Sequence, residues 1–260
     1  MSFKKIVTVI VILSVLVSCK KEDTETDNLF KFREYISYTT SGLSSIADPI
    51  QINLTKPVEK WEMEQEILDD IVNISPHVSG KLVVVNQQSI LFTPDEPLEP
   101  ATEYTVTVKL KNIYNDIPND FGNYTFQFKT ITPNFTINTT HLQSYSKEWQ
   151  YVEAVLRASD VISLQQAKQL VEASQNGKKL QIVFNEYNEK SRIFEFKIDS
   201  IHRKIEDSEI LVKWDGKAIN ADNTGKNTLI IPGINNFTIV GMEVIQLPEQ
   251  YVSINFSDPL

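Results

Sequence analysis

The fold is decided by the stretch Leu91-Phe92-Thr93-Pro94-Asp95-Glu96-Pro97-Leu98-Glu99-Pro100-Ala101-Thr102-Glu103-Tyr104-Thr105-Val106. It begins with apolar residues typical of a strand, passes through a proline-rich turn and resumes an alternating pattern at Tyr104. Because proline fixes φ and has no backbone N–H, Pro97 and Pro100 hold this turn extended and outside a hydrogen-bonded ladder. The alternation after Tyr104 points its ring toward a core. The stretch therefore predicts two strands of a sheet joined by a turn.

Further short segments with alternating apolar residues lie on either side of this stretch. They are residues 51–54, 81–85, 89–92, 104–110 and 124–129. Turn-rich pieces, such as residues 115–122, separate them. Strands of this length at this spacing are typical of an antiparallel β-sandwich. We therefore expect a first domain over residues 30–131, and Thr132-Pro133 is a plausible joint.

A second set of strand patterns follows the joint. It comprises residues 134–141, 149–157, 180–185, 193–201 and 209–214. Between them, Ser163 is followed three residues later by Gln166, and the apolar residues Leu164, Ala167 and Leu170 share one helical face. A capping box of this kind predicts one short amphipathic helix over residues 163–172. We thus expect a mainly β chain of tandem antiparallel β-sandwich domains, with one short helix in a second domain over residues 134–241.

The last residues repeat a pattern from the first domain. Val252-Ser253-Ile254-Asn255-Phe256-Ser257-Asp258-Pro259-Leu260 aligns without gaps on Ile50-Gln51-Ile52-Asn53-Leu54-Thr55-Lys56-Pro57-Val58, with three identities. One interpretation is that residues 243–260 start a further, incomplete repeat. The alternative is a last strand that closes the second domain.

The N-terminus has the order of a secretory signal. Lys4 and Lys5 precede a twelve-residue, mostly apolar run over residues 6–17, too short to span a membrane but long enough for a signal core. The following Leu16-Val17-Ser18-Cys19 resembles the lipobox of bacterial lipoproteins. That resemblance implies cleavage of a signal peptide over residues 1–18 and acylation of Cys19, which anchors the protein in the membrane. The alternatives are an uncleaved helical anchor and a chance cysteine after a signal.

The segment after Cys19 is polar. We expect residues 19–29 to form a disordered tether. The residues Lys20, Lys21, Glu22 and Asp23 resemble an export signal that directs lipoproteins to the outer face of the outer membrane, although a solvated spacer explains them as well. Removal of residues 1–18 takes away two lysines, so the formal net charge changes from −9 to −11. This charge gives no electrostatic basis for binding nucleic acid. Since Cys19 is the only cysteine, no internal disulfide forms.

The proline-rich stretch of residues 91–106 also resembles a known family. Residues 92–104 follow Phe-x-Pro-x-x-x-Leu-x-Pro-x-Thr-x-Tyr, and the first domain resembles the bacterial Ig-like module with this hallmark. Ala101 replaces the commoner glycine. The order of lipobox, module, β domain and partial repeat resembles the front of bacterial alpha-2-macroglobulin-like lipoproteins, and the second domain is then macroglobulin-like. The resemblance implies a role in trapping or inhibiting peptidases, which would be partners through downstream domains. No Cys-Gly-Glu-Gln thioester motif occurs, so this chain would supply tether and scaffold.

A second hypothesis is a stand-alone surface binding or adhesion lipoprotein with an Ig-like spacer. Its motives are the same tether and Trp61, a candidate ligand contact in a polar context. Trp149 and Trp214, by contrast, lie in strand patterns and are expected in the core. The three histidines are scattered, so we expect no metal and no cofactor. Asp69 and Asp70 are interpreted as a solvated face. Without a phosphate loop, nucleophile elbow or dinucleotide fingerprint, the sequence predicts no enzyme.

Overall fold

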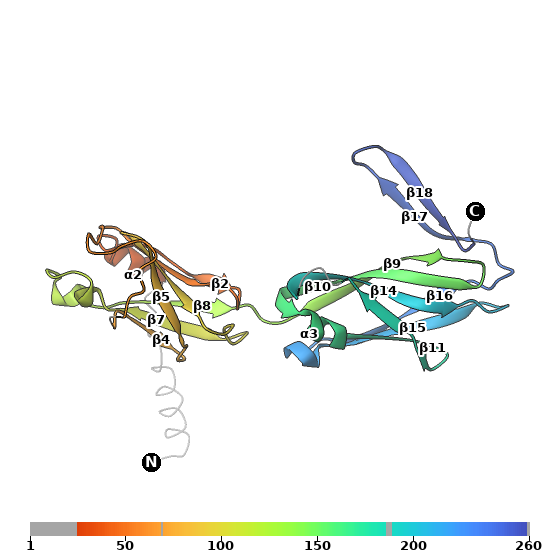
Figure 1. Cartoon of the computed structure of the whole chain (residues 1–260), viewed down its shortest axis with the longest axis horizontal. Helices are drawn as coiled ribbons and strands as arrows, with labels where there is room; N and C mark the ends of the chain where they lie inside the picture. The colour runs from red at the N-terminus through yellow and green to blue at the C-terminus, as the bar shows by residue number, and fades with distance from the viewer. Residues whose placement is uncertain (1–24, 69, 186–188, 259–260) are drawn as a thin grey trace, which may run out of the picture. The chain divides into compact units, whose positions relative to one another are not determined.

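The computed structural model describes residues 25–68, 70–185 and 189–258 (Figure 1). The signal peptide, Cys19 and the candidate export signal lie outside these residues. The chain divides into two compact units, of which unit 1 holds residues 1–41, 49–95 and 104–127, and unit 2 holds residues 42–48, 96–103 and 128–260. No helix within the described ranges is both long and apolar enough to cross a membrane.

The first β-sandwich is built from two four-stranded sheets, with the orders β1-β3-β6-β5 and β2-β8-β7-β4. The strands are β1 (Ile36–Thr39), β2 (Gly42–Ser44), β3 (Ile50–Leu54), β4 (Val72–Ser75), β5 (Gly80–Asn86), β6 (Ser89–Pro94), β7 (Glu103–Val108) and β8 (Tyr124–Thr130). Short 3₁₀ turns at Leu110–Asn112 and Asn119–Phe121 lie between β7 and β8. The pairs β1–β3, β3–β6, β5–β6 and β4–β7 are antiparallel, whereas β2 pairs with β8 in parallel.

The alternation in the sequence places the core of this sandwich as expected. Ile50, Ile52 and Leu54 of β3 are buried while the residues between them are half-exposed. Tyr104 is also buried, which confirms the inward direction of its ring. In the proline-rich turn, Ala101 has φ of 54°, a left-handed conformation that glycine adopts without strain.

The described part of the expected tether is helical. Residues 25–29 belong to helix α2 (Glu25–Lys31), so the expectation of disorder over residues 19–29 is wrong for this part. Phe32, next to the helix, is buried and packs edge-on against Phe121 and Tyr124, each at 5.2 Å between ring centroids. This aromatic contact fixes the C-terminal end of α2, which a polar composition alone did not indicate.

The second β-sandwich has sheets of order β13-β14-β10-β9 and β12-β11-β15-β16. Its strands are β9 (Phe135–Ser144), β10 (Trp149–Ser163), β11 (Val171–Gln175), β12 (Lys178–Lys179), β13 (Gln181–Phe184), β14 (Lys190–His202), β15 (Ser208–Asp215) and β16 (Thr224–Ile231). A 3₁₀ turn spans Gly216–Ile219. One apolar core joins both sheets, with Leu156, Ile198 and Ile210 fully buried in it. The expectation of a mainly β fold with tandem sandwiches is confirmed.

The one helix expected in this sandwich is α3 (Leu164–Gln169). Ser163 caps it, because its hydroxyl accepts from the Gln166 backbone N–H at 3.1 Å and the Gln166 side chain accepts from the Ser163 N–H at 2.9 Å. The predicted C-terminal end is wrong, since Val171 begins β11 and pairs with Trp214 of β15. β-branched Val171 and the period of two after it favour the sheet over further helix.

We expect Ser163→Ala to lower the free energy of unfolding by about 1 kcal/mol, because the Gln166 N–H loses its acceptor. Urea unfolding followed by circular dichroism measures this. Gln165→Ala, an exposed change in the same helix, is the control and should leave stability within about 0.5 kcal/mol. Equal effects of the two changes would contradict the capping role of Ser163.

The chain continues past the second sandwich into a hairpin of β17 (Ile239–Ile245) and β18 (Tyr251–Phe256). These strands form a separate two-stranded sheet, visible in blue in Figure 1. Among the described residues β18 pairs with β17 alone, so it does not close a sheet of the second sandwich.

Candidate functional site

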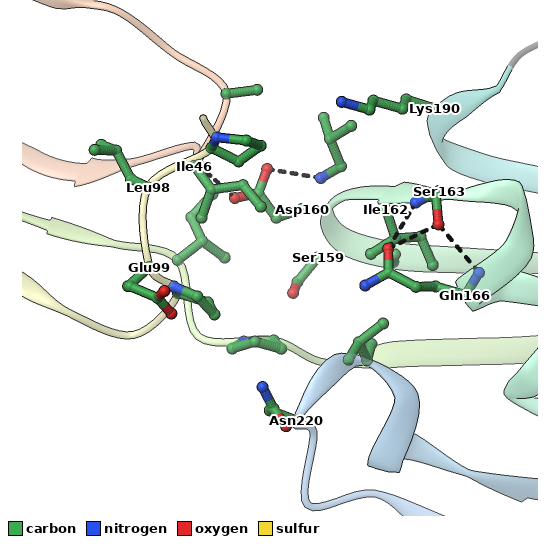
Figure 2. A pocket seen from close by; sticks show the side chains of 18 of the residues that line it. Ile46, Leu98, Glu99, Ser159, Asp160, Ile162, Ser163, Gln166, Lys190 and Asn220 are labelled. Carbon is green, nitrogen blue, oxygen red and sulfur yellow. Dashed lines mark hydrogen bonds between the residues drawn. The ribbon is translucent and has the colours of Figure 1, made fainter. Parts of the chain in front are cut away.

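A cavity of about 420 Å³ lies within unit 2 (Figure 2). It is lined by residues 46–47, 96–100, 131, 133–134, 158–163 and 218–220, together with Gln166 and Lys190. Three prolines and several aliphatic side chains make its wall largely apolar. Residues 42–48, which comprise β2 and the loop after it, and residues 96–103, which lead into β7, thus belong to the same unit as the cavity wall from β10.

Asp160 of β10 is the buried charged residue of this wall, with 6% of its surface exposed. Its carboxylate accepts hydrogen bonds from the Ser45 hydroxyl at 2.6 Å and from the Ile46 backbone N–H at 2.9 Å. It also accepts from the Val161 N–H at 2.7 Å and pairs with Arg192 at 3.2 Å. Four donors therefore occupy the two oxygens, and Asp160 fixes the loop of residues 42–48 against β10. A carboxylate committed in this way is poorly placed to act on a ligand.

The other polar side chains of the wall that have assigned bonds also serve local structure. Ser163 and Gln166 are the two partners of the α3 capping box, and the Ser159 hydroxyl donates to the Thr132 carbonyl at 3.0 Å. Figure 2 shows Asp160 and the capping pair as two separate clusters. Within residues 25–68, 70–185 and 189–258, no three His, Cys, Asp or Glu side chains gather as metal ligands.

Arg203, just after β14, is the second buried charge of unit 2 and is fully buried. Its guanidinium donates to the carbonyls of Pro232, Gly233, Lys147 and Ser257 at 2.6 to 3.1 Å. It also donates to the Asp258 carboxylate at 2.9 Å. One side chain thus joins three loops to the segment after β18. The hydrogen bond from Arg203 is the main cause that lowers the pKa of Asp258 below 3.8, against a smaller opposing effect of burial.

Gln150 lies beside this cluster and is fully buried. Its amide nitrogen donates to the Ser257 carbonyl at 2.9 Å and to the Ser144 hydroxyl at 3.0 Å. The Ser144 hydroxyl in turn donates to the same Ser257 carbonyl at 2.9 Å. We call Arg203, Gln150, Ser144, Ser257 and Asp258 the arginine cluster. Its bonds fasten the end of the β17–β18 hairpin to the second sandwich.

The structure corrects the expectations for Trp61 and Trp149, whereas Trp214 packs against the core of the second sandwich as expected. Trp61, the candidate ligand contact, is 6% exposed, and its backbone N–H donates to the Val58 carbonyl at 3.0 Å in a turn. Its polar sequence neighbours point outward while the large apolar ring is buried, so it presents no surface for a ligand. Trp149, expected in the core, is 44% exposed and packs edge-on against His202 at 4.7 Å.

Sequence analysis missed both buried charges. The sequence pattern predicts a strand that ends at Arg157, but β10 runs on to Ser163 and carries Asp160 inward. Arg203 stands in the polar run Arg203-Lys204 with no periodic signal around it. Its partners are mostly backbone carbonyls from distant loops, which a sequence pattern does not reveal. The proline-rich motif, by contrast, marked a loop of the cavity wall through Pro97 and Pro100.

Comparison with known proteins places the first sandwich in a family. Residues 31–130 match the family described as the bacterial Ig-like domain, and no curated protein matches the chain. Among solved structures, an L,D-transpeptidase from Mycobacterium tuberculosis H37Rv is 9% identical, covering 85% of this chain and 76% of its own, with a TM-score of 0.27. A tandem pair of titin Ig domains is 12% identical, with 76% and 92% covered and a TM-score of 0.26. These scores carry no functional information. Residues 31–130 are a bacterial Ig-like domain.

Proposed function

We propose that this chain is the lipid-anchored, non-catalytic scaffold region of an alpha-2-macroglobulin-like protein of the bacterial cell envelope. The proposal draws on the lipobox resemblance of residues 16–19, the Ig-like domain of residues 31–130 and the second β-sandwich after it. In this role the chain holds further domains at the outer membrane, and peptidases are met by those domains.

The single observation that supports the scaffold role is that the two buried charged side chains, Asp160 and Arg203, form hydrogen bonds within their own unit. Asp160 accepts four donors from its own unit, and Arg203 donates to five oxygens of its own unit. Catalytic and ligand-binding groups keep some hydrogen-bonding capacity for what they bind. Here the strongest groups hold loops in place, as a load-carrying module requires.

The macroglobulin part of the proposal has its own test. Reading the gene past codon 260 should reveal macroglobulin domains in the same frame. Their absence would contradict a role in peptidase trapping. It would not bear on the lipid anchor, which is tested separately. The adhesion hypothesis has two motives, the tether and an exposed Trp61, and the buried position of that ring removes the second.

We expect Cys19→Ser to abolish membrane anchoring, because the acyl chain is attached through the Cys19 sulfur. Several buried acyl chains hold a protein far more firmly than one, at about 0.8 kcal/mol per methylene. In the native host, an alkyne fatty acid should label the wild type, whereas the variant should take up no label and appear as precursor or soluble protein. Ser18→Ala, which retains the sulfur, is the control. A labelled Cys19→Ser variant would contradict the anchor.

A further inference from the structure

The β17–β18 hairpin exposes one apolar face. The pairing Met242 with Ile254 and Val244 with Val252 places these four side chains on the same side of the hairpin. They are 62%, 43%, 65% and 53% exposed, respectively. The opposite side carries Gly241, Glu243, Ser253 and Asn255, and the pair Ile245 and Tyr251 next to the turn. A hairpin with this division normally turns its apolar side to a core, so this side lacks a cover among the described residues.

The hairpin shares its pairing at one end with β1 and β3 of the Ig-like domain, which are neighbours in their sheet although β2 of the other sheet lies between them in sequence. There, Ile36 pairs with Leu54, the register shifts, and Tyr38 and Thr39 pair with Asn53 and Ile52. In the β17–β18 hairpin, Ile239 pairs with Phe256, the register shifts in the same place, and Gly241 and Met242 pair with Asn255 and Ile254. The bulge therefore recurs at the equivalent residue, which extends the sequence repeat of β3 and β18 to their partner strands.

The hydrogen bonds at this end of the two strand pairs also agree. The Thr55 N–H donates to the Tyr35 carbonyl at 2.9 Å, and the equivalent Ser257 N–H donates to the Thr238 carbonyl at 2.9 Å. The Thr55 hydroxyl donates to the Arg33 carbonyl at 2.8 Å, and the Ser257 hydroxyl donates to the Asn236 carbonyl at 3.1 Å. Residues 236–242 and 254–257 thus repeat the backbone pairing of residues 33–39 and 52–55, whereas the connections between the paired segments differ, since residues 42–44 form β2 and β17 runs on to Ile245.

The first sandwich shows what covers such a hairpin. The second edge of β3 pairs with β6, where Ile50 and Ile52 lie opposite Phe92 and Ile90. With both sheets in place, Ile50 and Ile52 are 1% and 0% exposed. Their equivalents in the β17–β18 hairpin are Val252 and Ile254, which are about half exposed, and β18 has no strand on its second edge among the described residues.

We propose that the β17–β18 hairpin opens a third Ig-like sandwich, and that its apolar face and the free edge of β18 are covered by the polypeptide that follows residue 260 in the same protein. The covering segment supplies a strand like β6, antiparallel to β18, with alternate apolar residues facing Val252 and Ile254, and then a second sheet over them. The inference does not depend on peptidase trapping, since a third sandwich with any role satisfies it.

Hydrogen exchange with mass spectrometry tests this on two proteins, the mature chain ending at residue 260 and the product of the complete reading frame, both with Cys19→Ser for solubility. Pairing of the free edge should slow exchange of the amides of residues 251–256 about 100-fold or more in the longer protein. The amides of β3 serve as the control and should exchange equally in both. A reading frame that ends at codon 260, or equal exchange of β18 in both proteins, would overturn the proposal.

A second copy of the chain is the competing cover. If the 260-residue chain protects β18 by itself, and this protection grows with protein concentration alongside dimer formation in analytical ultracentrifugation, the cover comes from another copy and the proposal is wrong. A monomer with rapid exchange at β18 is the expected result.

Variants on the two sides of β18 make the test sharper. In the complete protein, Ile254→Asp should abolish the added protection of residues 251–256, because a carboxylate would enter the new core. Asn255→Asp, on the opposite side, should preserve it. In the chain ending at residue 260, neither change should shift the unfolding midpoint, since Ile254 is already 43% exposed there. Equal behaviour of the two variants in the complete protein would contradict a core on the apolar side.

Discussion

Arg203→Ala is expected to lower the free energy of unfolding of the second sandwich by about 3–5 kcal/mol. The fully buried guanidinium holds four carbonyls and the Asp258 carboxylate, and its removal leaves these acceptors without donors in a cavity. Arg203→Lys should also destabilise, because a single ammonium group cannot reproduce the planar fork. Urea unfolding followed by tryptophan fluorescence, to which Trp149 and Trp214 of the second sandwich contribute beside Trp61 of the first, measures the loss.

Arg157→Ala, a change at an exposed arginine of β10, is the control and should alter stability by no more than about 0.5 kcal/mol. The pH dependence gives a second readout. Since the pKa of Asp258 is lowered in the folded protein, the pair stabilises the fold above the ordinary pKa and this contribution is lost as the pH falls through the lower folded value. Arg203→Ala should remove that part of the acid sensitivity. A wild-type-like midpoint would show that the arginine cluster does not fasten the hairpin.

Asp160→Ala carries the second largest expected effect, about 2–4 kcal/mol of unfolding free energy. It leaves the Ser45 hydroxyl and the Ile46 and Val161 N–H groups without their acceptor. The Arg192 pair adds little, because that side chain is 48% exposed. The loop of residues 42–48 should also lose hydrogen-exchange protection, which separates release of this loop from general destabilisation.

Two further variants check the Asp160 assignment. Asp160→Asn keeps the shape and one acceptor oxygen, so its effect should fall between those of wild type and alanine. Asp222→Ala, at an exposed aspartate, should be nearly neutral. If Asp160→Ala leaves the exchange of residues 42–48 unchanged, Asp160 does not hold this loop.

The sequence predicts the parts of the fold that depend on local periodicity. The strands of both sandwiches that alternate over four or more residues, such as β3 and β8, were located within a few residues, as was the capped start of α3 at Ser163. The short strands β1, β2 and β4 have too few residues to show a period. The end of α3 was misplaced because pairing of Val171 with Trp214 is a tertiary effect.

The candidate sites were less predictable than the fold. A side chain whose partners are backbone carbonyls of distant loops, like Arg203, leaves no spacing pattern in the sequence, and Trp61 shows that polar neighbours do not imply an exposed ring. The repeat of β3 in β18 was visible from the sequence. The similarity of the partner strands β1 and β17, and of the bulge in each, is visible only in the structure, since β1 and β17 have little sequence in common.

The lipid anchor is the central claim, and the intact mass of the protein purified from envelope membranes of its host tests it most directly. We expect a polypeptide that begins at Cys19, heavier than its sequence by a diacylglyceryl group and an amide-linked acyl chain on that residue. An unmodified N-terminus at any residue, or a chain that still carries residues 1–18, would contradict it.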